Sequence, residues 1–497
     1  MADELAIADE PELLRLCEAL GLGTLRSPAS PAHERTLAAI EEELSRLPGV
    51  EVRADAFEIL RWQADDLEHA GRLSLAGVAV PVIGAVPYSN PVVRAGELVH
   101  VPRGEPITDA VRGKVVLRDF PDIPLPYELV LGELLHSSGD LDALQGEVFD
   151  RGGFADEPLH QDLLAACAAG AAGVVVAFDL PREQLVGYWE PHKGTHYSLP
   201  AVFVGVDERD QLLGAVGAQA ELSVSAEVGP ATTRNLFATI PGRTSERLVL
   251  LTHTDGNTWV QENGPVAVLA LAAALAALPL EQRQRTVELA FTSCHLHISR
   301  EGSQSFAMRE DARYDDSRDP SPLVAVIAIE HLGTREIVPV PRAAGPGREL
   351  VMTDDAELLF WSVGPSDTLR SVVGKAVDRR RPARTAVLPG LFPSTTGQVP
   401  RHGSMGGIGT YFHRHLMPTT ALISGPWSLW APSFGQAALD LAHLRDQLLA
   451  VGDVLRDLDG LPRDEVAGEY PELRRARAAG APTYPPEHPP EVLGAPG

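Results

Sequence analysis

The pattern of hydrophobic and polar positions changes along the chain, from a helical repeat near the N-terminus to short apolar runs further on. Residues 32–47 repeat leucine or isoleucine every three or four positions, and Ser30 and Pro31 ahead of them are typical of a helix cap and first turn. This pattern predicts an amphipathic helix. From about Leu73 to Ala226, apolar runs are short and broken by Gly and Pro, which predicts a small β-rich unit. Its strands are expected at residues 113–120, 173–178 and 199–206.

After Pro230 the pattern changes to strands that alternate with helices. Continuous apolar runs of strand length occupy residues 248–252, 286–292, 323–330 and 419–424, and helical patterns occupy residues 266–278 and 434–458. Fully apolar strands that alternate with helices indicate a parallel sheet covered on both faces. We therefore predict the α/β class, a three-layer sandwich with a mostly parallel central sheet.

Composition narrows the class of protein. The 497 residues carry a formal charge of −26, so the basic surface that nucleic-acid binding requires is not expected. The apolar stretch 265–280 is too short to span a bilayer, and the first residues do not resemble a signal peptide, so we expect a cytoplasmic protein without membrane contact. Three cysteines far apart in sequence predict neither disulfides nor a cysteine zinc cluster.

Metal-ligand residue types follow three of the predicted strands. His253-Thr254-Asp255 follows the first, Ser293-Cys294-His295-Leu296-His297 the second and Glu330-His331 the third, and Glu262 opens the helix after the first strand. Ligands of open α/β sheets bind beyond the carboxyl ends of the strands. Imidazole and carboxylate groups there favour zinc or a similar ion, and Asp255 is placed to orient the ring of His253.

Each feature also has a structural interpretation. Glu262 is a favourable first-turn carboxylate for a helix, Glu330 is a plausible solvated strand end, and His295 and His297 resemble loop histidines. His331, His413 and His415 are expected to be surface or hydrogen-bonded histidines. The convergence of polar groups on one edge of the sheet nevertheless favours a metal site, or the remnant of one.

These residues resemble the dizinc exopeptidases of metallopeptidase family twenty-eight, which include bacterial aminopeptidases, glutamate carboxypeptidase and the glutaminyl cyclases. NLFATIPGRTSERLVLLTHTDG at 235–256 resembles the family's first site strand, and IEHLG at 329–333 resembles its Asp-Met-Ile-Gly. VRGKVVLRDF, AACAAGAAGVVVAF and YSLPAVFVGVD, between residues 111 and 207, resemble a protease-associated insert. The resemblance implies an α/β domain at 5–60 and 231–465, the insert at 65–230 and a Pro-rich tail at 466–497.

The resemblance also implies an altered site. Leu296 falls where the family has its general base, His297 where it has a glutamate ligand, and Trp430 where it has its last metal histidine. Glu262 and Glu330 replace two aspartates. The ligand set that this implies is His253, Glu262 and Glu330 with His297 as the fourth, holding one zinc ion rather than two. His295 is the candidate replacement base.

Three functions remain open at this point. The first is a metal-dependent hydrolase of the aminopeptidase type, acting on a peptide, amide or amino-acid conjugate. The second is a catalytically degenerate homologue that binds a peptide-like ligand or partner. The third is amide chemistry without attack by water, as in the glutaminyl cyclases. The expected partner is a small peptide-like or amide substrate, and a homo-oligomer is compatible with the sequence.

Overall fold

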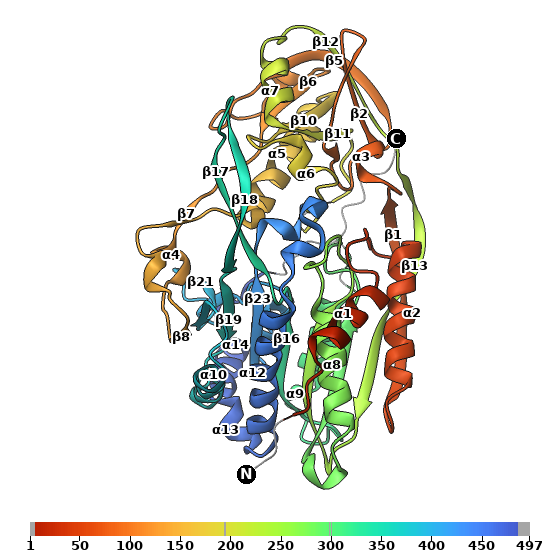
Figure 1. Ribbon diagram of the computed structural model, residues 1–497. Helices are drawn as coiled ribbons and strands as arrows, with labels where there is room; N and C mark the ends of the chain where they lie inside the picture. The colour runs from red at the N-terminus through yellow and green to blue at the C-terminus, as the bar shows by residue number, and fades with distance from the viewer. Residues whose placement is uncertain (1–4, 193–194, 298, 300, 486–497) are drawn as a thin grey trace.

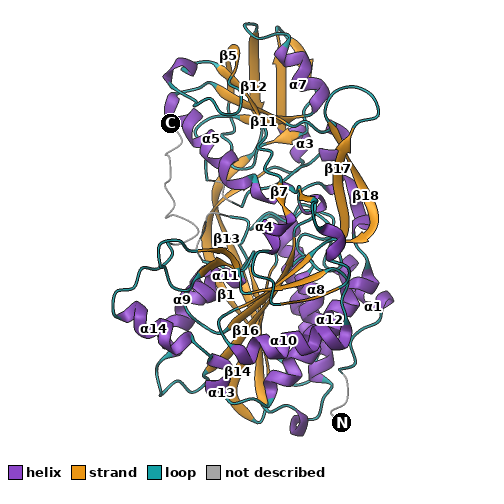
Figure 2. Ribbon diagram, turned by 90° about the vertical axis from the view of Figure 1, so that its left-hand side faces the viewer, coloured by secondary structure: helices purple, strands orange, loops and turns teal. Residues whose placement is uncertain are grey.

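The computed structural model describes residues 5–192, 195–297, 299 and 301–485. Its larger part is a nine-stranded sheet between two layers of helices (Figure 2). The strand order is β1 (Glu51–Gln63), β13 (Glu227–Ile240), β15 (Arg285–Thr292), β14 (Thr244–His253), β16 (Leu323–Ile329), β23 (Thr419–Ser424), β19 (Leu359–Val363), β20 (Thr385–Leu388) and β8 (His136–Ser138).

The sheet is parallel in its middle and mixed at its margins. Strands β15, β14, β16 and β23 are mutually parallel, whereas β1 and β13 pair antiparallel and β13 pairs antiparallel with β15. Beyond β23, only the β19–β20 pair is parallel. The middle strands are the continuous apolar runs of the sequence, and every residue of β16 is buried. Strands buried on both faces need such runs because neither face meets water.

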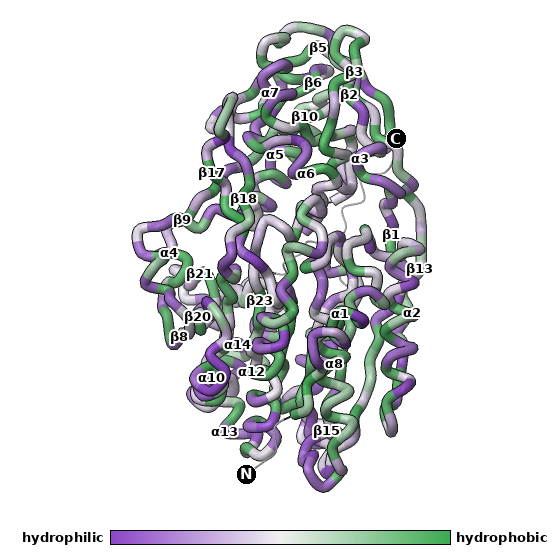
Figure 3. The backbone as a smooth tube through the Cα atoms, viewed as in Figure 1, coloured by the Kyte–Doolittle hydropathy of each residue, from purple (hydrophilic) through white to green (hydrophobic). Residues whose placement is uncertain are grey.

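Helices cover both faces of this sheet. Helices α1, α8 and α12 lie on one side and α9, α11 and α14 on the other (Figure 2). Hydrophobic residues follow the strands between these layers (Figure 3). Helix α8 is buried on nearly its whole surface, which fits its Ala-rich, almost uniformly apolar sequence. The helices are α1 (Glu10–Ala19), α2 (Pro31–Ser45), α8 (Gly264–Ala276), α9 (Ser303–Tyr314), α10 (Asp367–Arg380), α11 (Gly409–Arg414), α12 (Leu441–Asp459), α13 (Arg463–Ala467) and α14 (Tyr470–Ala478).

The predicted helix ends are right in one case and wrong in another. Ser30 caps α2 by accepting a hydrogen bond from the His33 amide, as the sequence predicts. The helix predicted over 434–458 begins only at Leu441, where Asp440 caps it, and residues 432–438 form 3-10 turns instead. The predicted tail is also too long. Residues 463–478 form α13 and α14, while 486–497 lie outside the described residues.

A second, eight-stranded sheet lies at the top of the molecule (Figure 1). It contains all three strands predicted between residues 113 and 206. Its order is β3 (Val78–Val80), β2 (Gly71–Leu75), β12 (Gln219–Val224), β5 (Val93–His100), β6 (Val115–Asp119), β10 (Gly173–Ala177), β11 (Ala201–Val204) and β4 (Gly84–Ala85), and the helices beside it are α3 (Leu67–Ala70), α5 (Asp156–Ala169), α6 (Arg182–Leu185) and α7 (Val206–Leu213). The assignment of this unit to a protease-associated domain stays a prediction.

The predicted boundaries of the insert are too simple, because residues 125–149 pack on the larger sheet. Strand β8 pairs with β20 at the sheet edge, and Tyr127 and Phe149 share a hydrophobic core with Phe360. In the other direction, a hairpin of β17 (Arg335–Pro341) and β18 (Arg348–Ala356) reaches the upper unit (Figure 1). The remaining short elements are β7 (Leu125–Pro126), α4 (Tyr127–Leu131), β9 (Val148–Phe149), β21 (Leu391–Pro393) and β22 (His402–Ser404). Among the described residues, none of the helices has the length and hydropathy to cross a bilayer.

Candidate metal centre

Four metal-ligand side chains meet at the carboxyl edge of the parallel strands. His253 is the last residue of β14, Glu262 lies two residues before α8, and Glu330 and His331 directly follow β16. One ligand atom of each lies within 4.8 Å of the others. All four residues are buried, with exposed fractions between 0% and 5%. The adjacent parallel strands β14 and β16 therefore bring together groups that lie up to 78 residues apart in sequence.

The carboxylates face the imidazoles at close range. His253 Nε2 lies 2.8 Å from Glu262 Oε2 and 3.5 Å from Glu330 Oε2. His331 Nε2 lies 3.2 Å from the same Glu262 oxygen. Because Glu262 Oε2 is close to both rings, it lies at the centre of the group.

Each carboxylate is fixed by one oxygen and presents the other to the group. Glu262 Oε1 accepts hydrogen bonds from the Thr252 hydroxyl at 3.1 Å and from the Gly264 amide at 2.6 Å. Glu330 Oε1 accepts one from the Ile408 amide at 2.8 Å. The two Oε2 atoms have no hydrogen-bond partner among the described residues. A buried polar atom without a partner is costly, so both oxygens are suited to a cation.

The imidazoles are oriented in the same manner. His331 Nδ1 lies 3.1 Å from the Ser424 carbonyl oxygen, which only accepts, so Nδ1 carries the proton. In the neutral ring, Nε2 then presents its lone pair to Glu262. His253 Nδ1 lies 3.4 Å from Asp255 Oδ1, which is the arrangement expected of an orienting carboxylate.

Asp255 is itself held by the chain that follows β15. Its Oδ2 accepts the Leu296 amide at 2.6 Å, and its Oδ1 accepts the His295 amide at 3.3 Å. The carboxylate is fully buried. Asp255 therefore ties the loop of the candidate base to the ring of His253.

Burial and charge shift the pKa values of the group in opposite directions. Burial raises the pKa of Glu330 to about 7, and Glu262 adds to this effect while His253 and His331 oppose it. Burial acts in the same way on Glu262, but attraction to His253 and His331 outweighs it and lowers the pKa of that carboxyl. Burial would lower the pKa of His253, but Glu262 and Asp255 raise it well above its ordinary value. The carboxylates and imidazoles of the group therefore interact strongly with one another.

The donor set fits a divalent ion. Two carboxylate oxygens and two imidazole nitrogens are borderline to hard ligands of the kind that zinc accepts. The four atoms are buried, close together and without hydrogen bonds to other described residues. His253, Glu262, Glu330 and His331 are the residues that would hold it.

The structure corrects the predicted fourth member of this group. His297 Nε2 donates to the Leu60 carbonyl at 3.0 Å, and its Nδ1 accepts the Ser299 amide at 2.9 Å, so both ring nitrogens are occupied elsewhere. The chain turns at Cys294, which has φ of +66°, and this turn carries His297 toward β1. His331, expected to be an ordinary histidine, lies in the group instead. The sequence signal for His331 as a ligand was its position directly after Glu330.

The other histidines are placed as follows. The ring of His295 lies between His253 and His192, with ring centres 4.5 and 4.8 Å away, and its Nε2 is 3.8 Å from Glu330 Oε2. His413 and His415 are hydrogen-bonded away from the group, as expected: His413 bonds the Tyr470 hydroxyl and His415 bonds Asp311.

A cavity of about 430 Å³ opens beside the group. His295, Leu296 and His331 line it, so the cavity reaches both the metal group and the candidate base. Much of the remaining lining is apolar and consists of Phe149, Phe154, Phe360, Leu391, Phe392, Ile423, Leu429 and Trp430. Asp156, Glu190 and His192 form a second group of ligand-type side chains, of which Asp156 and His192 also line the cavity.

No protein-family model matches the sequence, and a comparison with curated proteins finds no similar sequence. Solved structures match over nearly the whole chain. The zinc aminopeptidase BSAP from Bacillus subtilis has a TM-score of 0.61 at 14% identity, covering 91% of this chain and 95% of that one. A peptidase M28 precursor from Shewanella amazonensis has a TM-score of 0.59 at 14% identity, with 91% and 93% covered. An aminopeptidase from Aneurinibacillus has a TM-score of 0.54 at 16% identity, with 90% and 93% covered. The chain has the fold of these three peptidases.

Proposed function

We propose that this protein is a metal-dependent hydrolase of the aminopeptidase type, with one zinc ion and an altered catalytic base. The observation that carries the proposal is the group of four buried ligand atoms without other partners, on the wall of a cavity. The fold of known zinc aminopeptidases supports the same conclusion. His253, Glu262, Glu330 and His331 are the proposed ligands.

When bound, a zinc ion supplies Lewis acidity and lowers the pKa of a coordinated water. The protein must add a proton acceptor near the reacting atoms. Leu296, where the family has its glutamate base, cannot accept a proton. His295 is the nearest alternative, because its ring lines the cavity and its Nε2 lies 3.8 Å from Glu330 Oε2. We assign it the role of general base, and Asp255 the role of holding His253 and the His295 amide in place.

The cavity indicates which substrates would fit. Aromatic and aliphatic side chains form much of its lining, and 430 Å³ is within the range of small-molecule sites. Phe149 and Phe154 come from the segment after β8, whereas Phe360 and Ile423 come from the larger sheet. We therefore propose an amide or small peptide with a large apolar group as the substrate.

The test is a comparison of zinc-loaded protein with two variants on a panel of amino-acid amides with apolar and charged side chains. His295→Gln should keep its zinc and lose ~10²- to 10⁴-fold in kcat, the usual contribution of a general base. His69→Gln, on an exposed histidine, is the matched control and should behave as wild type. Zinc-loaded wild type without turnover of any amide would contradict the proposal, as would full activity in His295→Gln.

A binding protein is the second candidate, because the family resemblance aligns Leu296 with the general base, and Leu296 lines the cavity. The variant Leu296→Glu, alone and together with Trp430→His, distinguishes the hydrolase from the binding protein. If the cleft still accepts peptides, the new carboxylate should raise amide hydrolysis by up to ~10²- to 10⁴-fold. A folded, zinc-loaded double variant without hydrolysis, in a protein that binds but does not cleave peptides, would favour the binding function.

A further inference from the structure

Arg26, a buried arginine from the N-terminal region, contacts the loop between His253 and Glu262. Arg26 is 0% exposed, and its Nη2 donates to the Gln261 carbonyl at 2.8 Å. Its Nη1 donates to the carbonyls of Thr24 at 3.1 Å and Gly21 at 3.3 Å. The guanidinium thus ties the carbonyl next to Glu262 to the turn between α1 and α2.

The backbone of the same arginine pairs with the other end of the loop. The Arg26 amide donates to the Gly256 carbonyl at 2.7 Å, and the Gly256 amide donates to the Arg26 carbonyl at 3.3 Å. Residues 256 and 261, at the two ends of the loop between His253 and Glu262, are therefore both fixed by one residue. A loop fixed at both ends has little freedom to move its ligands.

The loop packs tightly against the Arg26 side chain. A Cβ at Gly256 would lie 2.6 Å from Arg26 Nη2 and 2.3 Å from the Gln261 carbonyl oxygen, so only glycine fits. The neighbouring turn is equally tight, because a Cβ at Gly23 would lie 2.5 Å from Trp259 Nε1.

Salt-bridge formation does not explain the burial of this charge. Among the described residues, no carboxylate lies within ion-pair distance of the Arg26 guanidinium, although Asp255 and Glu262 act on it at longer range. Burying a charge is costly unless ion pairs or hydrogen bonds compensate for the lost water. Here all three of the side-chain bonds go to backbone carbonyls, in directions that the planar fork of arginine can reach and lysine cannot reach together.

We propose that Arg26 is a positioning residue for the metal centre, which sets the backbone of the 256–262 loop so that Glu262 meets His253 and His331. The inference rests on the proposed metal site. Partners that orient a metal ligand typically contribute 10- to 100-fold in metal affinity, and we expect an effect of that size. The effect on affinity comes from the position of the loop backbone, and Arg26 should hold the loop in this position in metal-free protein too.

The test compares Arg26→Met and Arg26→Lys with wild type by zinc competition titration and by hydrogen exchange of the Gly256 amide in metal-free protein. Arg26→Met should bind zinc ~10- to 100-fold more weakly and should exchange the Gly256 amide faster. Arg26→Lys can keep one of the three hydrogen bonds, so its zinc affinity should lie between those of wild type and Arg26→Met. Arg247→Met is the matched control, since Arg247 is a buried arginine on β14 that pairs with Glu288 and Glu310 away from the metal group.

The outcomes separate this inference from the proposed function. Zinc binding by wild type with unchanged affinity in Arg26→Met would overturn the role of Arg26 and leave the metal site standing. Equal losses in Arg26→Met and Arg247→Met would overturn it too, because they would mean a general effect of instability. If wild type binds no zinc, the proposed function fails, and Gly256 exchange alone then decides whether Arg26 fixes the loop. If Arg26→Met does not fold, Arg26→Lys decides, with a threefold or larger loss of affinity in support and no loss in contradiction.

Discussion

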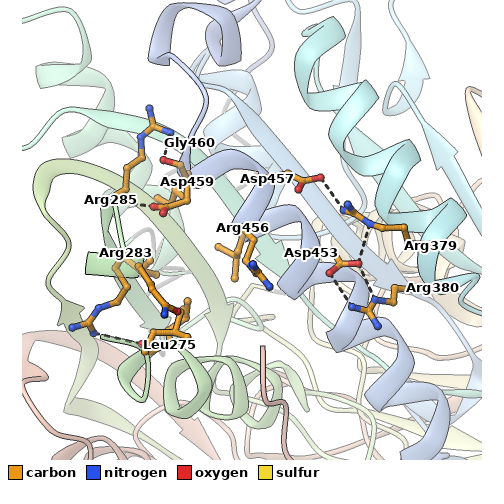
Figure 4. A pocket seen from close by; sticks show the side chains of 15 residues that line it. Leu275, Arg283, Arg285, Arg379, Arg380, Asp453, Arg456, Asp457, Asp459 and Gly460 are labelled. Carbon is orange, nitrogen blue, oxygen red and sulfur yellow. Dashed lines mark hydrogen bonds and ion pairs between the residues drawn. The ribbon is translucent and has the colours of Figure 1, made fainter. Parts of the chain in front are cut away.

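The two ends of the nine-stranded sheet both gather charged side chains, but they balance the charge in different ways. Near the amino end of β15, a cavity of about 840 Å³ is lined by arginines and aspartates (Figure 4). Asp453 accepts from both Arg379 and Arg380, and Asp457 accepts from Arg379. Arg285 donates to the carbonyls of Leu458 and Leu461 and pairs with Glu246.

At the carboxyl end, the described carboxylates of the group face imidazoles instead of arginines at ion-pair distance. Three carboxylates, Asp255, Glu262 and Glu330, are fully or almost fully buried, and two of them present an oxygen with no hydrogen bond to any described residue. The amino end therefore uses charge to hold helices α10 and α12 together. The carboxyl end instead gathers carboxylates and imidazoles, the ligand types of a cation site, around two carboxylate oxygens.

The largest effect that this comparison predicts is the loss of metal-linked stability at the carboxyl end. An ion that binds only the folded protein stabilises it by about 4 kcal/mol at a thousandfold excess over Kd. His253→Ala should remove bound zinc and that increment, as chelation of wild type should. Metal analysis and urea unfolding with and without zinc measure both. Unchanged metal content in His253→Ala would reject this ligand assignment.

A sharper test compares two histidines at the same end. His331→Ala should weaken zinc binding by ~10-fold or more, since it removes an imidazole that faces Glu262 at 3.2 Å. His297→Ala should leave zinc affinity unchanged, because both nitrogens of His297 bond elsewhere. Titration of both variants with a competing chelator gives the two affinities. The opposite ranking would restore the ligand set expected from the sequence.

The two histidines also show what the sequence could and could not predict. Apolar runs identified the middle strands and hence the edge where His253, Glu262 and Glu330 meet. The choice between His331 and His297 depended on backbone turns after the strands, with His331 at φ +51° and Cys294 at φ +66°. Residue type alone does not identify these positions, because neither residue is Gly, the type that adopts positive φ readily.

The strands at the two margins of the sheet could not be predicted from the sequence, for a related reason. Residues 227–235 contain Gly and Pro and lack an apolar run, yet they form part of the long pair β1–β13, whose partner is distant in sequence. Strand β8 has only three residues and depends on pairing with β20. Long-range pairing, rather than local propensity, decides such strands.

At the amino end the comparison predicts a change in stability without a change in metal binding. Asp453→Asn removes a charge that binds two arginines, and Asp453 is partly accessible, so a loss of about 1–2 kcal/mol is expected. Zinc content should equal that of wild type. Asp464→Asn, on an exposed aspartate of α13, is the control. A loss of zinc in Asp453→Asn would mean that the two ends of the sheet are coupled.

The smallest predicted effect concerns pH and helix α14. Burial alone would raise the pKa of Asp311, but hydrogen bonds from His415, Arg477 and Arg474 hold it well below its ordinary value. A lowered folded-state pKa contributes stability that is complete above the unfolded pKa of ~4 and is lost as the pH falls further. Asp311→Asn should therefore cost about 1 kcal/mol at pH 7, and the difference from wild type should shrink below about pH 4. Urea unfolding at several pH values measures it, and a difference independent of pH would contradict the ionic origin.

The central claim is that four side chains at the carboxyl edge hold one divalent ion. The most direct measurement is an anomalous difference map from crystals of the full chain grown with zinc and recorded on both sides of the zinc absorption edge. The account predicts one buried peak, in contact with His253 Nε2, Glu262 Oε2, Glu330 Oε2 and His331 Nε2. The absence of a peak there at saturating zinc, or a peak only beside Asp156 and His192, would contradict it.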